Sequence, residues 1–273
     1  MDPARRHRYL RALGVEVWTR RDAAGITADV TEPAVEVAVA RETPVRETPK
    51  REAPIRAERA VPAAVVEEAR IAEPPPPPFV PPADWEGLRA AVTGCQRCKL
   101  CKTRTNTVFG VGHATARLMI VGEGPGADED LKGEPFVGRA GQLLDEMLAA
   151  IGRSRKAGGA GDAVYIANVV KCRPPGNRDP ENDEVDACRP FLEQQIRLIQ
   201  PKLILGLGRI AAQRLLASDA PLSRLRGPLH HYGAERTPLF ITYHPAYLLR
   251  SPREKAKSWE DLKKVWQFLR DTP

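Results

Sequence analysis

Four short apolar runs that alternate with helical patterns constrain the fold of this chain more than any other feature. The runs are RLMIVGEG, AVYIANVVKC, KLILGLG and PLFITYHP, spread over residues 117–245. Each is rich in Ile, Val and Leu and closes on Gly, Pro, Cys or His, as buried parallel strands do. Helical spacing of apolar residues recurs in residues 140–152, 180–200, 209–217 and 258–270.

This alternation predicts an α/β fold. A short central parallel sheet is expected between two layers of helices, in a three-layer α/β/α arrangement. Ligands of such sheets bind at the carboxyl ends of the strands. The polar motifs of this chain follow the apolar runs and are therefore expected at that edge.

Composition changes sharply near Trp85. Before it, RETPVRETPKREAP repeats an Arg-Glu-Thr/Ala-Pro unit, and EPPPPPFVPP follows. Such residues cannot bury enough apolar surface to offset the entropy of ordering them. We therefore expect a disordered Pro-rich linker over residues 23–84 and a folded domain over residues 85–273. Residues 1–22 form a short basic amphipathic segment, which is either a disordered tail or a docking motif for a protein partner or for the protein's own domain.

The N-terminus MDPARRHRYL carries charges and lacks the apolar run of a signal peptide. No stretch approaches the ~20 apolar residues of a membrane span. We expect a soluble, cytoplasmic monomer without membrane contact. The formal net charge of +7 favours a polyanionic partner, although a merely basic soluble protein has the same balance.

The five cysteines are clustered in the sequence. In a reducing cytoplasm such cysteines favour metal binding or redox chemistry over disulfides. Cys95 and Cys98 form a C-x2-C pair, whereas Cys172 and Cys188 have fifteen residues between them, too open for the second knuckle of a zinc ribbon. Cys101 extends the first pair, but the ending of a bacterial ferredoxin motif is missing. The spacing indicates a metal centre and favours an iron–sulfur cluster over zinc.

GEGPGADED, which follows the first apolar run, fits the dinucleotide fingerprint G-x-G-x-x-G/A. Pro125 would lie inside the phosphate turn, however, and DEDLKGEPFVG reads as an acidic loop where an apolar helix should begin. The sequence therefore disfavours a dinucleotide site. Glycines let a planar ligand or a nucleotide backbone approach the main chain closely, and carboxylates such as Glu123 lie beside them.

Two further motifs carry polar residues at strand ends. His244, in YHPAYLLR, is either a catalytic group or a satisfied core histidine. Leu248 and Leu249, on an expected exposed turn before Arg250, either insert into a base stack or pack in a loop. Asn168 lies in an apolar strand, where an unbonded amide costs ~1–3 kcal/mol, so it either caps a loop or reads a ligand. Its amide matches the O4 acceptor and N3–H donor of uracil, whereas cytosine presents the opposite pattern.

Together these residues resemble the family-4 uracil-DNA glycosylases, the iron–sulfur branch of the uracil-DNA glycosylase superfamily. The resemblance runs from about Trp85 to the C-terminus and rests on CQRC, GEGPGADED, GEPFVGRAGQLLD, YIANVVKCRPPGNR and HPAYLLR. It implies a DNA repair enzyme that flips uracil out of DNA and hydrolyses its N-glycosidic bond, leaving an abasic site for base excision repair. It also implies that Cys95, Cys98, Cys172 and Cys188 hold a 4Fe-4S cluster, with Cys101 spare.

The resemblance implies a role for each residue of the binding pocket. Phe136 looks like the aromatic residue that stacks on the flipped uracil, and Asn168 like the residue that reads its Watson–Crick edge. Glu123 and Gly124 would line the pocket and guard against the 5-methyl group of thymine. His244 resembles the histidine that hydrogen-bonds uracil O2 while the bond breaks.

The expected chemistry departs from that of the best-known branch of the superfamily. That branch has a water-orienting aspartate where this chain, like family 4, has Gly124. Glu129 and Asn177 resemble family positions implicated in placing the hydrolytic water. We expect dissociative bond cleavage, with negative charge on uracil O2 met by His244 and backbone N–H groups. The loop KCRPPGNRDPEND lacks the histidine of a related branch that forms a covalent adduct, and His230 and His231 are expected on the surface.

A competing class is a cluster-bearing DNA-binding module without enzymatic activity. The cysteines and the basic balance fit it equally well. A base-reading pocket does not, because a scaffold has no need of one. Release of free uracil from a uracil-containing oligonucleotide separates the two classes.

Overall fold

The computed structural model describes residues 79–159 and 161–272 of the chain. The predictions for residues 1–22 and for most of the 23–84 linker lie outside these residues. Within them, no helix is both long and apolar enough to cross a membrane.

A six-stranded sheet forms the centre of the described domain, with strand order β1-β3-β2-β4-β6-β5. Its four central strands are parallel: β2 (Leu118–Gly122), β3 (Val164–Asn168), β4 (Leu203–Leu207) and β6 (Thr237–Thr242). These are the four predicted strands, and the parallel sheet is confirmed. Two short antiparallel edge strands, β1 (Val111–Gly112) and β5 (His230–Tyr232), were not predicted because neither contains an apolar run.

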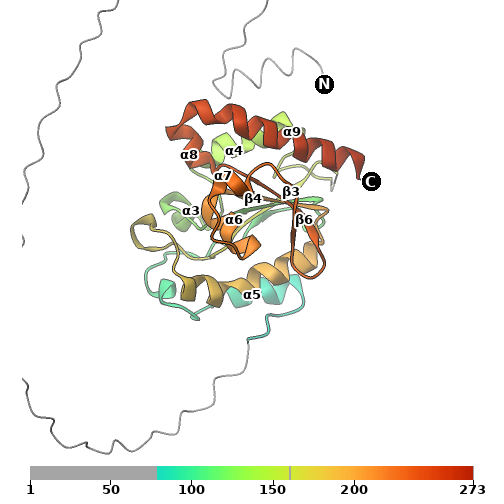
Figure 1. Cartoon of the computed structure of the whole chain (residues 1–273). Coiled ribbons are helices and arrows are strands. Elements are labelled where there is room, and N and C mark those ends of the chain that lie inside the picture. Colours follow the sequence, from blue (N-terminus) through green and yellow to red (C-terminus); the bar gives the residue numbers. More distant parts are fainter. Residues whose placement is uncertain (1–78, 160, 273) are drawn as a thin grey trace, which may run out of the picture. The chain divides into compact units, whose positions relative to one another are not determined.

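Helices cover both faces of this sheet (Figure 1), which confirms the three-layer arrangement. One layer contains α2 (Trp85–Thr93), α5 (Asn182–Ile199), α6 (Gly208–Leu216) and α7 (Leu222–Leu225). The other contains α4 (Arg139–Ala150), α8 (Pro245–Arg250) and α9 (Lys255–Asp271). The described residues also include three single 3-10 turns: η1 (Lys99–Lys102), η2 (Pro175–Asn177) and η3 (Pro252–Glu254).

The central strands are apolar throughout because both of their faces are buried. In β2, Met119 and Val121 pack against the α5 layer, whereas Leu118 and Ile120 pack against the α4 and α9 layer. All five residues of the strand are buried. A strand covered on both sides reads as a continuous apolar run rather than an alternating one, which is why sequence reasoning found it.

One segment that was expected to be a loop is partly helical. The helix α3 (Ala127–Lys132) begins directly after the Gly-rich turn and ends at Gly133, whose φ is 71°. The side chain of Glu129 accepts from the backbone N–H of Gly126 and so caps the start of the helix. Six residues give too short a periodic pattern to be recognised in the sequence.

Packing against the domain begins before Trp85. The ring of Phe79 lies edge-on to the ring of Phe191 in α5, with centroids 5.2 Å apart, and the guanidinium of Arg97 lies 4.0 Å from its centroid. Asp84 caps α2 by accepting from the N–H of Gly87 at 2.7 Å. The segment that enters the domain is therefore anchored on the α5 layer.

Candidate active site and candidate cluster site

A cavity of about 420 Å³ lies at the carboxyl ends of β2, β3 and β6. Its lining includes eight of the ten residues that the sequence singled out for catalysis, base binding or DNA contact: Glu123, Gly124, Glu129, Phe136, Asn168, Asn177, His244 and Arg250. These residues come from segments far apart in the chain. The fold thus brings the predicted pocket residues together at the expected edge of the sheet.

The ring of Phe136 forms one wall of this cavity. Its side chain is buried, and its ring centroid lies 5.6 Å from that of His244, with the planes tilted by 31°. Gly122 makes room for it: a Cβ atom there would lie 2.7 Å from Phe136 Cζ and 2.5 Å from Asn168 Oδ1. Only glycine at the end of β2 allows both side chains to approach the strand so closely.

Asn168, the last residue of β3, is 2% exposed. Within the described residues its side-chain oxygen Oδ1 is buried and has no hydrogen-bond partner. A buried acceptor that is left unpaired costs ~1–3 kcal/mol, so native proteins rarely keep one without a reason. If Asn168 capped a neighbouring loop through this oxygen, a hydrogen bond to that loop would be present, and none is found among the described residues. The interpretation that Asn168 binds a ligand is therefore favoured.

His244 faces Phe136 from the N-cap of α8. Its Nδ1 atom accepts from the backbone N–H of Ala246 at 3.2 Å. Burial lowers the pKa of His244 to about 4, the positive charge of Arg250 lowers it further, and Glu129 opposes the shift. The ring is therefore neutral near pH 7, and because Nδ1 is an acceptor, its proton resides on Nε2.

Glu129 joins the two loops that flank the cavity. Its Oε1 atom accepts from the N–H groups of Val137 at 2.9 Å and Gly138 at 3.2 Å, while Oε2 accepts from that of Gly126 at 3.1 Å. Both carboxylate oxygens are thus bonded to backbone. Asn177, the other residue predicted to place water, has its Oδ1 atom bonded to Arg173 Nε at 2.7 Å.

Two carboxylates of the cavity lining, Glu123 and Asp179, are close enough to interact. Burial and the neighbouring charge of Asp179 raise the pKa of Glu123 to about 7, and the charge of Arg209 opposes this shift. Arg209 Nη2 is 2.5 Å from Asp179 Oδ2. Sequence reasoning missed Asp179 and Arg209 as neighbours of the pocket. The only signal was the position of Asp179, two residues after Asn177 in a polar loop.

The prediction that Leu248 lies on an exposed turn is wrong. HPAYLLR forms the helix α8, in which His244 is the N-cap and Pro245 the first residue, so Leu248 turns inward. It is 1% exposed and packs in the α4 and α9 layer. The large apolar side chains that α8 exposes are Tyr247 and Leu249, at 37% and 36%, and Tyr247 also lines the cavity.

All five cysteines are free thiols and line one further cavity. Cys95, Cys98 and Cys101 come from the segment around η1, Cys172 follows β3, and Cys188 lies in α5. The predicted set of two distant segments is therefore brought together. No group of three or more His, Cys, Asp or Glu among the described residues is arranged to hold a single metal ion. The thiols that bind a cluster of several iron atoms lie farther apart than the ligands of one ion.

The surroundings of these thiols suit a negatively charged group. Arg104 Nη1 donates to Cys172 Sγ at 3.1 Å, and the backbone N–H of Lys171 donates to Cys188 Sγ at 3.2 Å. Burial raises the pKa of the Cys188 thiol to about 12, so this cysteine becomes a thiolate only when a cation binds it. Hydrogen bonds to the sulfurs are among the features by which proteins stabilise iron–sulfur clusters. The donor set therefore fits such a cluster.

A buried lysine lies between the two cavities. Lys171 Nζ donates to the backbone oxygen of Asn168 at 2.8 Å and to Gln195 Oε1 at 2.7 Å. Gln195 in turn donates to the backbone oxygen of Phe109 at 2.9 Å. The backbone N–H of the same lysine donates to Cys188, so Lys171 connects the residue that ends β3 with one cysteine of the second cavity.

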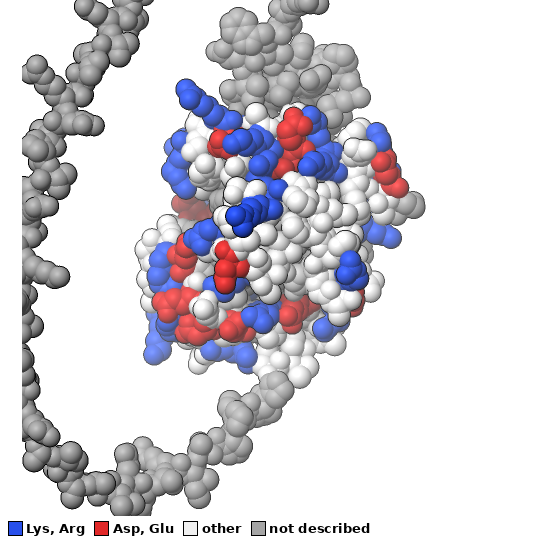
Figure 2. Space-filling model, viewed as in Figure 1, with Lys and Arg blue, Asp and Glu red and all other residues white. Residues whose placement is uncertain are grey.

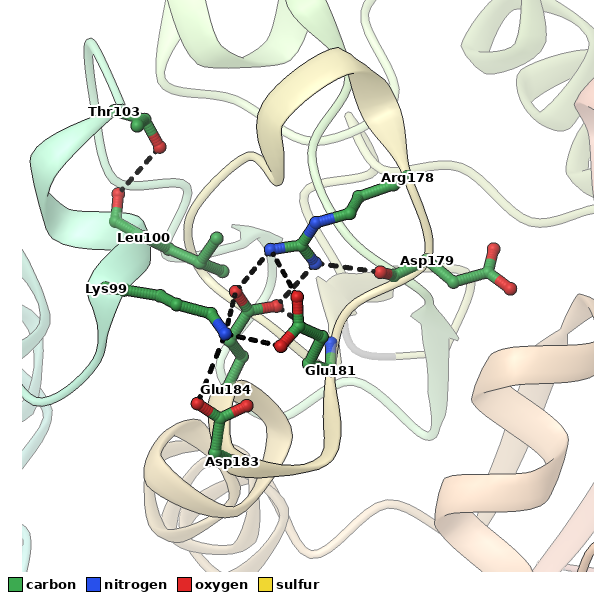
Figure 3. A network of polar contacts seen from close by, with 8 residues as sticks. All are labelled: Lys99, Leu100, Thr103, Arg178, Asp179, Glu181, Asp183 and Glu184. Carbon is green, nitrogen blue, oxygen red and sulfur yellow. Dashed lines mark hydrogen bonds and ion pairs between the residues drawn. The ribbon is translucent and has the colours of Figure 1, made fainter. Parts of the chain in front are cut away.

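A polar network also connects the cysteine segment with the loop that bears Asn177 (Figure 3). Lys99, in η1, contacts Glu181 and lies 3.4 Å from Asp183. Arg178 binds Glu184 through two hydrogen bonds of 2.8 and 2.6 Å, and the side chain of Glu184 is fully buried. Glu184 lies at the start of α5. The network fixes the pocket loop to the element that carries Cys188.

Basic and acidic side chains are interspersed on the face of the domain that Figure 2 shows. On this face they do not segregate into one continuous basic surface. The net charge of +7 therefore cannot be assigned to a single patch there.

The fold and the cavity define an α/β protein with a pocket for a small planar ligand at the carboxyl edge of its sheet. A profile of the uracil DNA glycosylase superfamily matches residues 109–270. The chain is 44% identical over 183 residues to the type-4 uracil-DNA glycosylase of Archaeoglobus fulgidus, covering 65% of this chain and 89% of the relative. It is 43% identical over 185 residues to that of Pyrobaculum aerophilum, covering 66% and 91%. A type-5 uracil-DNA glycosylase of Thermus thermophilus is 36% identical over 150 residues, covering 50% and 68%.

The chain belongs to the uracil DNA glycosylase superfamily, in its type-4 branch. This confirms the resemblance that the motifs indicated.

Proposed function

We propose that this protein removes uracil from DNA by hydrolysing the N-glycosidic bond, which leaves an abasic site for repair. The observation that carries the proposal is the buried, unpaired Oδ1 atom of Asn168 beside the ring of Phe136 in a 420 Å³ cavity. An amide and an aromatic face together match the edge and the plane of a single flipped base. Relatives that are over 40% identical carry the name uracil-DNA glycosylase.

Asn168 is proposed to select the base. Its Nδ2 group donates to uracil O4, and its Oδ1 atom accepts from uracil N3–H. Cytosine presents a donor at position 4 and an acceptor at N3, so the same amide would face two mismatched groups. Each mismatched buried pair costs ~1–3 kcal/mol, which is enough for discrimination of about a hundredfold or more.

His244 is proposed to stabilise the leaving uracil. The neutral ring donates through Nε2–H to uracil O2, where negative charge develops as the bond lengthens. The donor is held in place by the Nδ1 bond to Ala246, so little reorganisation is needed during the reaction. One such preorganised donor stabilises a transition state by ~3–4 kcal/mol.

Water is proposed to add to the sugar from the side of Asn177. Gly124 offers no carboxylate there, so a mechanism with two catalytic carboxylates is a poor description. Since the Oδ1 atom of Asn177 accepts from Arg173, its Nδ2 group is the part left to orient water. Glu129 contributes by holding the loops in place through its three backbone hydrogen bonds.

The DNA is proposed to lie across α8. Arg250 can neutralise a phosphate, and the exposed side chain of Leu249 can enter the space that the flipped base leaves. Uracil-containing DNA is the partner of this surface. We further propose that the protein acts as a monomer and that residues 1–22 dock on a protein partner.

We propose a 4Fe-4S cluster on Cys95, Cys98, Cys172 and Cys188. When bound, such a cluster supplies covalent cross-links between segments that are far apart in the chain. Arg104 and the Lys171 backbone donate hydrogen bonds to its thiolates, which offsets part of their negative charge. Cys101 lines the same cavity and is proposed to be spare.

Release of free uracil from an oligonucleotide with one uracil tests the proposed function. The protein should release the base, and His244→Ala should reduce the single-turnover rate by roughly 100-fold to 1,000-fold. His231→Ala, on the exposed edge strand β5, is the matched control and should retain the rate of the unchanged protein. Binding of the oligonucleotide without uracil release would instead support the non-enzymatic module.

A further inference from the structure

The backbone of Phe136 adopts a conformation that its side chain disfavours. Its φ is +56°, in the left-handed region that bulky residues rarely occupy. Such a conformation persists only where the surrounding structure holds it, and it is found preferentially at functional sites. The groups that hold this loop therefore determine where the ring of Phe136 lies.

Arg155 holds the loop from one side. Its Nη1 atom donates to the backbone oxygen of Pro135 at 2.7 Å and its Nη2 atom to that of Phe136 at 3.1 Å. Its Nε atom is bonded to Asp145 Oδ1 in α4 at 2.8 Å, and its side chain is 5% exposed. The planar guanidinium can make all three bonds at once, whereas a lysine ammonium has one nitrogen.

Glu129 holds the next two residues from the other side, through the N–H groups of Val137 and Gly138. The start of α4 closes the third side. A Cβ atom on Gly141 would lie 1.8 Å from the backbone oxygen of Phe136, so α4 packs directly on that carbonyl. Four consecutive residues, 135–138, are thus bonded to two charged side chains of opposite sign.

We propose that Arg155 is a positioning residue that fixes the ring of Phe136 in the plane where the flipped base stacks. Arg155 is not among the residues that line the cavity, so it acts on the substrate only through the loop of Phe136. The inference rests on the proposed function, because the ring needs this position only if a base stacks on it. Its role is distinct from that of Glu129, which also bonds to the Gly-rich turn.

A double-mutant cycle tests this role. Arg155→Ala and Phe136→Leu should each lower the single-turnover rate of uracil excision by about tenfold or more. The variant that carries both changes should be no slower than the slower single variant, within about twofold, because removal of the ring leaves Arg155 nothing to position. Arg153→Ala, two residues away on the same loop, is the matched control and should leave the rate unchanged. The Arg153 side chain lies 3.8 Å from Asp162 and, among the described residues, forms no hydrogen bond to residues 135–138.

Two further measurements separate positioning from general stability. Arg155→Ala should bind an oligonucleotide with an abasic site as tightly as the unchanged protein, because no base occupies the pocket in that complex. Arg155→Lys keeps the charge beside Asp145 but cannot bond both carbonyls, so its excision rate should lie between those of the unchanged protein and Arg155→Ala. If Arg155→Ala does not fold, Arg155→Lys replaces it in the cycle.

The proposal would be wrong if the rate of the double variant fell by the product of the two single fold-decreases. It would also be wrong if Arg155→Ala lost affinity for the abasic-site oligonucleotide by as large a factor as it loses excision rate. Either result leaves the proposed function intact. Absence of uracil release by the unchanged protein would refute the proposed function itself.

Discussion

The pKa values of two residues in the pocket are shifted in opposite directions, and both shifts favour the uncharged form of the side chain. Burial raises the pKa of Glu123 to about 7 and lowers that of His244 to about 4. Near neutral pH, His244 carries no charge and a substantial fraction of Glu123 is protonated. A pocket that releases an anionic base benefits from this, because a fixed carboxylate charge would repel the charge that develops on uracil.

Excision should therefore slow as the pH rises through about 7. Below that pH Glu123 is protonated and neutral, whereas above it the carboxylate is negative and opposes the developing charge. His244 is neutral over the whole range from pH 5.5 to 8.5, so it adds no titration there. Single-turnover rates should follow this decline in the unchanged protein. Glu123→Gln stays neutral and should show no decline, and a decline that survives this change would assign the titration to another group.

Base selection is expected to reside in Asn168. Asn168→Ala should lower uracil excision by about a hundredfold, because two buried hydrogen bonds of ~1–3 kcal/mol each are lost. Asn168→Asp should lose most uracil excision and gain slow cytosine excision, since a protonated carboxyl can donate to cytosine N3 and accept from its amino group. The measurement is single-turnover excision from matched duplexes with uracil or cytosine opposite guanine. Near-normal uracil excision by Asn168→Ala would show that the residue has a structural role.

Some helices and strands were easier to predict from the sequence than others. The strands β2, β3, β4 and β6 are buried on both faces, so their apolar runs were visible, and α4, α5, α6 and α9 carry full amphipathic periods. The short helices α3 and α8 have only six residues each. Burial of Leu248 follows from the packing of α8 on α4 and α9, which no local pattern in HPAYLLR reveals.

The candidate site was predictable where residue type alone carries the chemistry. Glycines, an amide, a histidine and cysteines at strand ends could be recognised one motif at a time. Arg155 could not, because its role depends on carbonyl groups twenty and nineteen positions away and not on any motif of its own. Asp179 and Arg209 likewise meet only after folding.

Loss of the proposed cluster should destabilise the packing of the elements that carry the cysteines. Single replacement of Cys95, Cys98, Cys172 or Cys188 by Ala should remove the absorbance near 400 nm and the bound iron, and should lower the temperature of unfolding. Cys101→Ala is the matched control within the same cavity and should retain all three. Loss of colour in Cys101→Ala together with its retention in Cys188→Ala would contradict the proposed ligand set.

At the scale of the whole molecule, residues 85–273 are proposed to be the catalytic domain, and Phe79 anchors the segment that precedes it. A chain that begins at Phe79 should therefore fold and excise uracil at the rate of the full chain. A chain that begins at Ala83 should remain active, but its free energy of unfolding should be lower by ~1–2 kcal/mol. The reason is that it lacks the ring of Phe79, which packs between Phe191 and Arg97. Denaturant titration measures the difference. Inactivity of the longer of these two chains at low salt would show that residues 1–78 contribute to substrate binding.

Hydrogen bonds of Lys171 connect Asn168 with Cys188, one of the proposed ligands of the cluster. Lys171 Nζ bonds to the backbone oxygen of Asn168, and the Lys171 backbone N–H donates to the sulfur of Cys188. Loss of the proposed cluster is therefore expected to weaken the support of Asn168, the residue proposed to read the base. Deaminated cytosines would then escape removal and be copied as thymine. If the proposed function and the proposed cluster are both correct, iron starvation should therefore raise the frequency of C·G to T·A mutations.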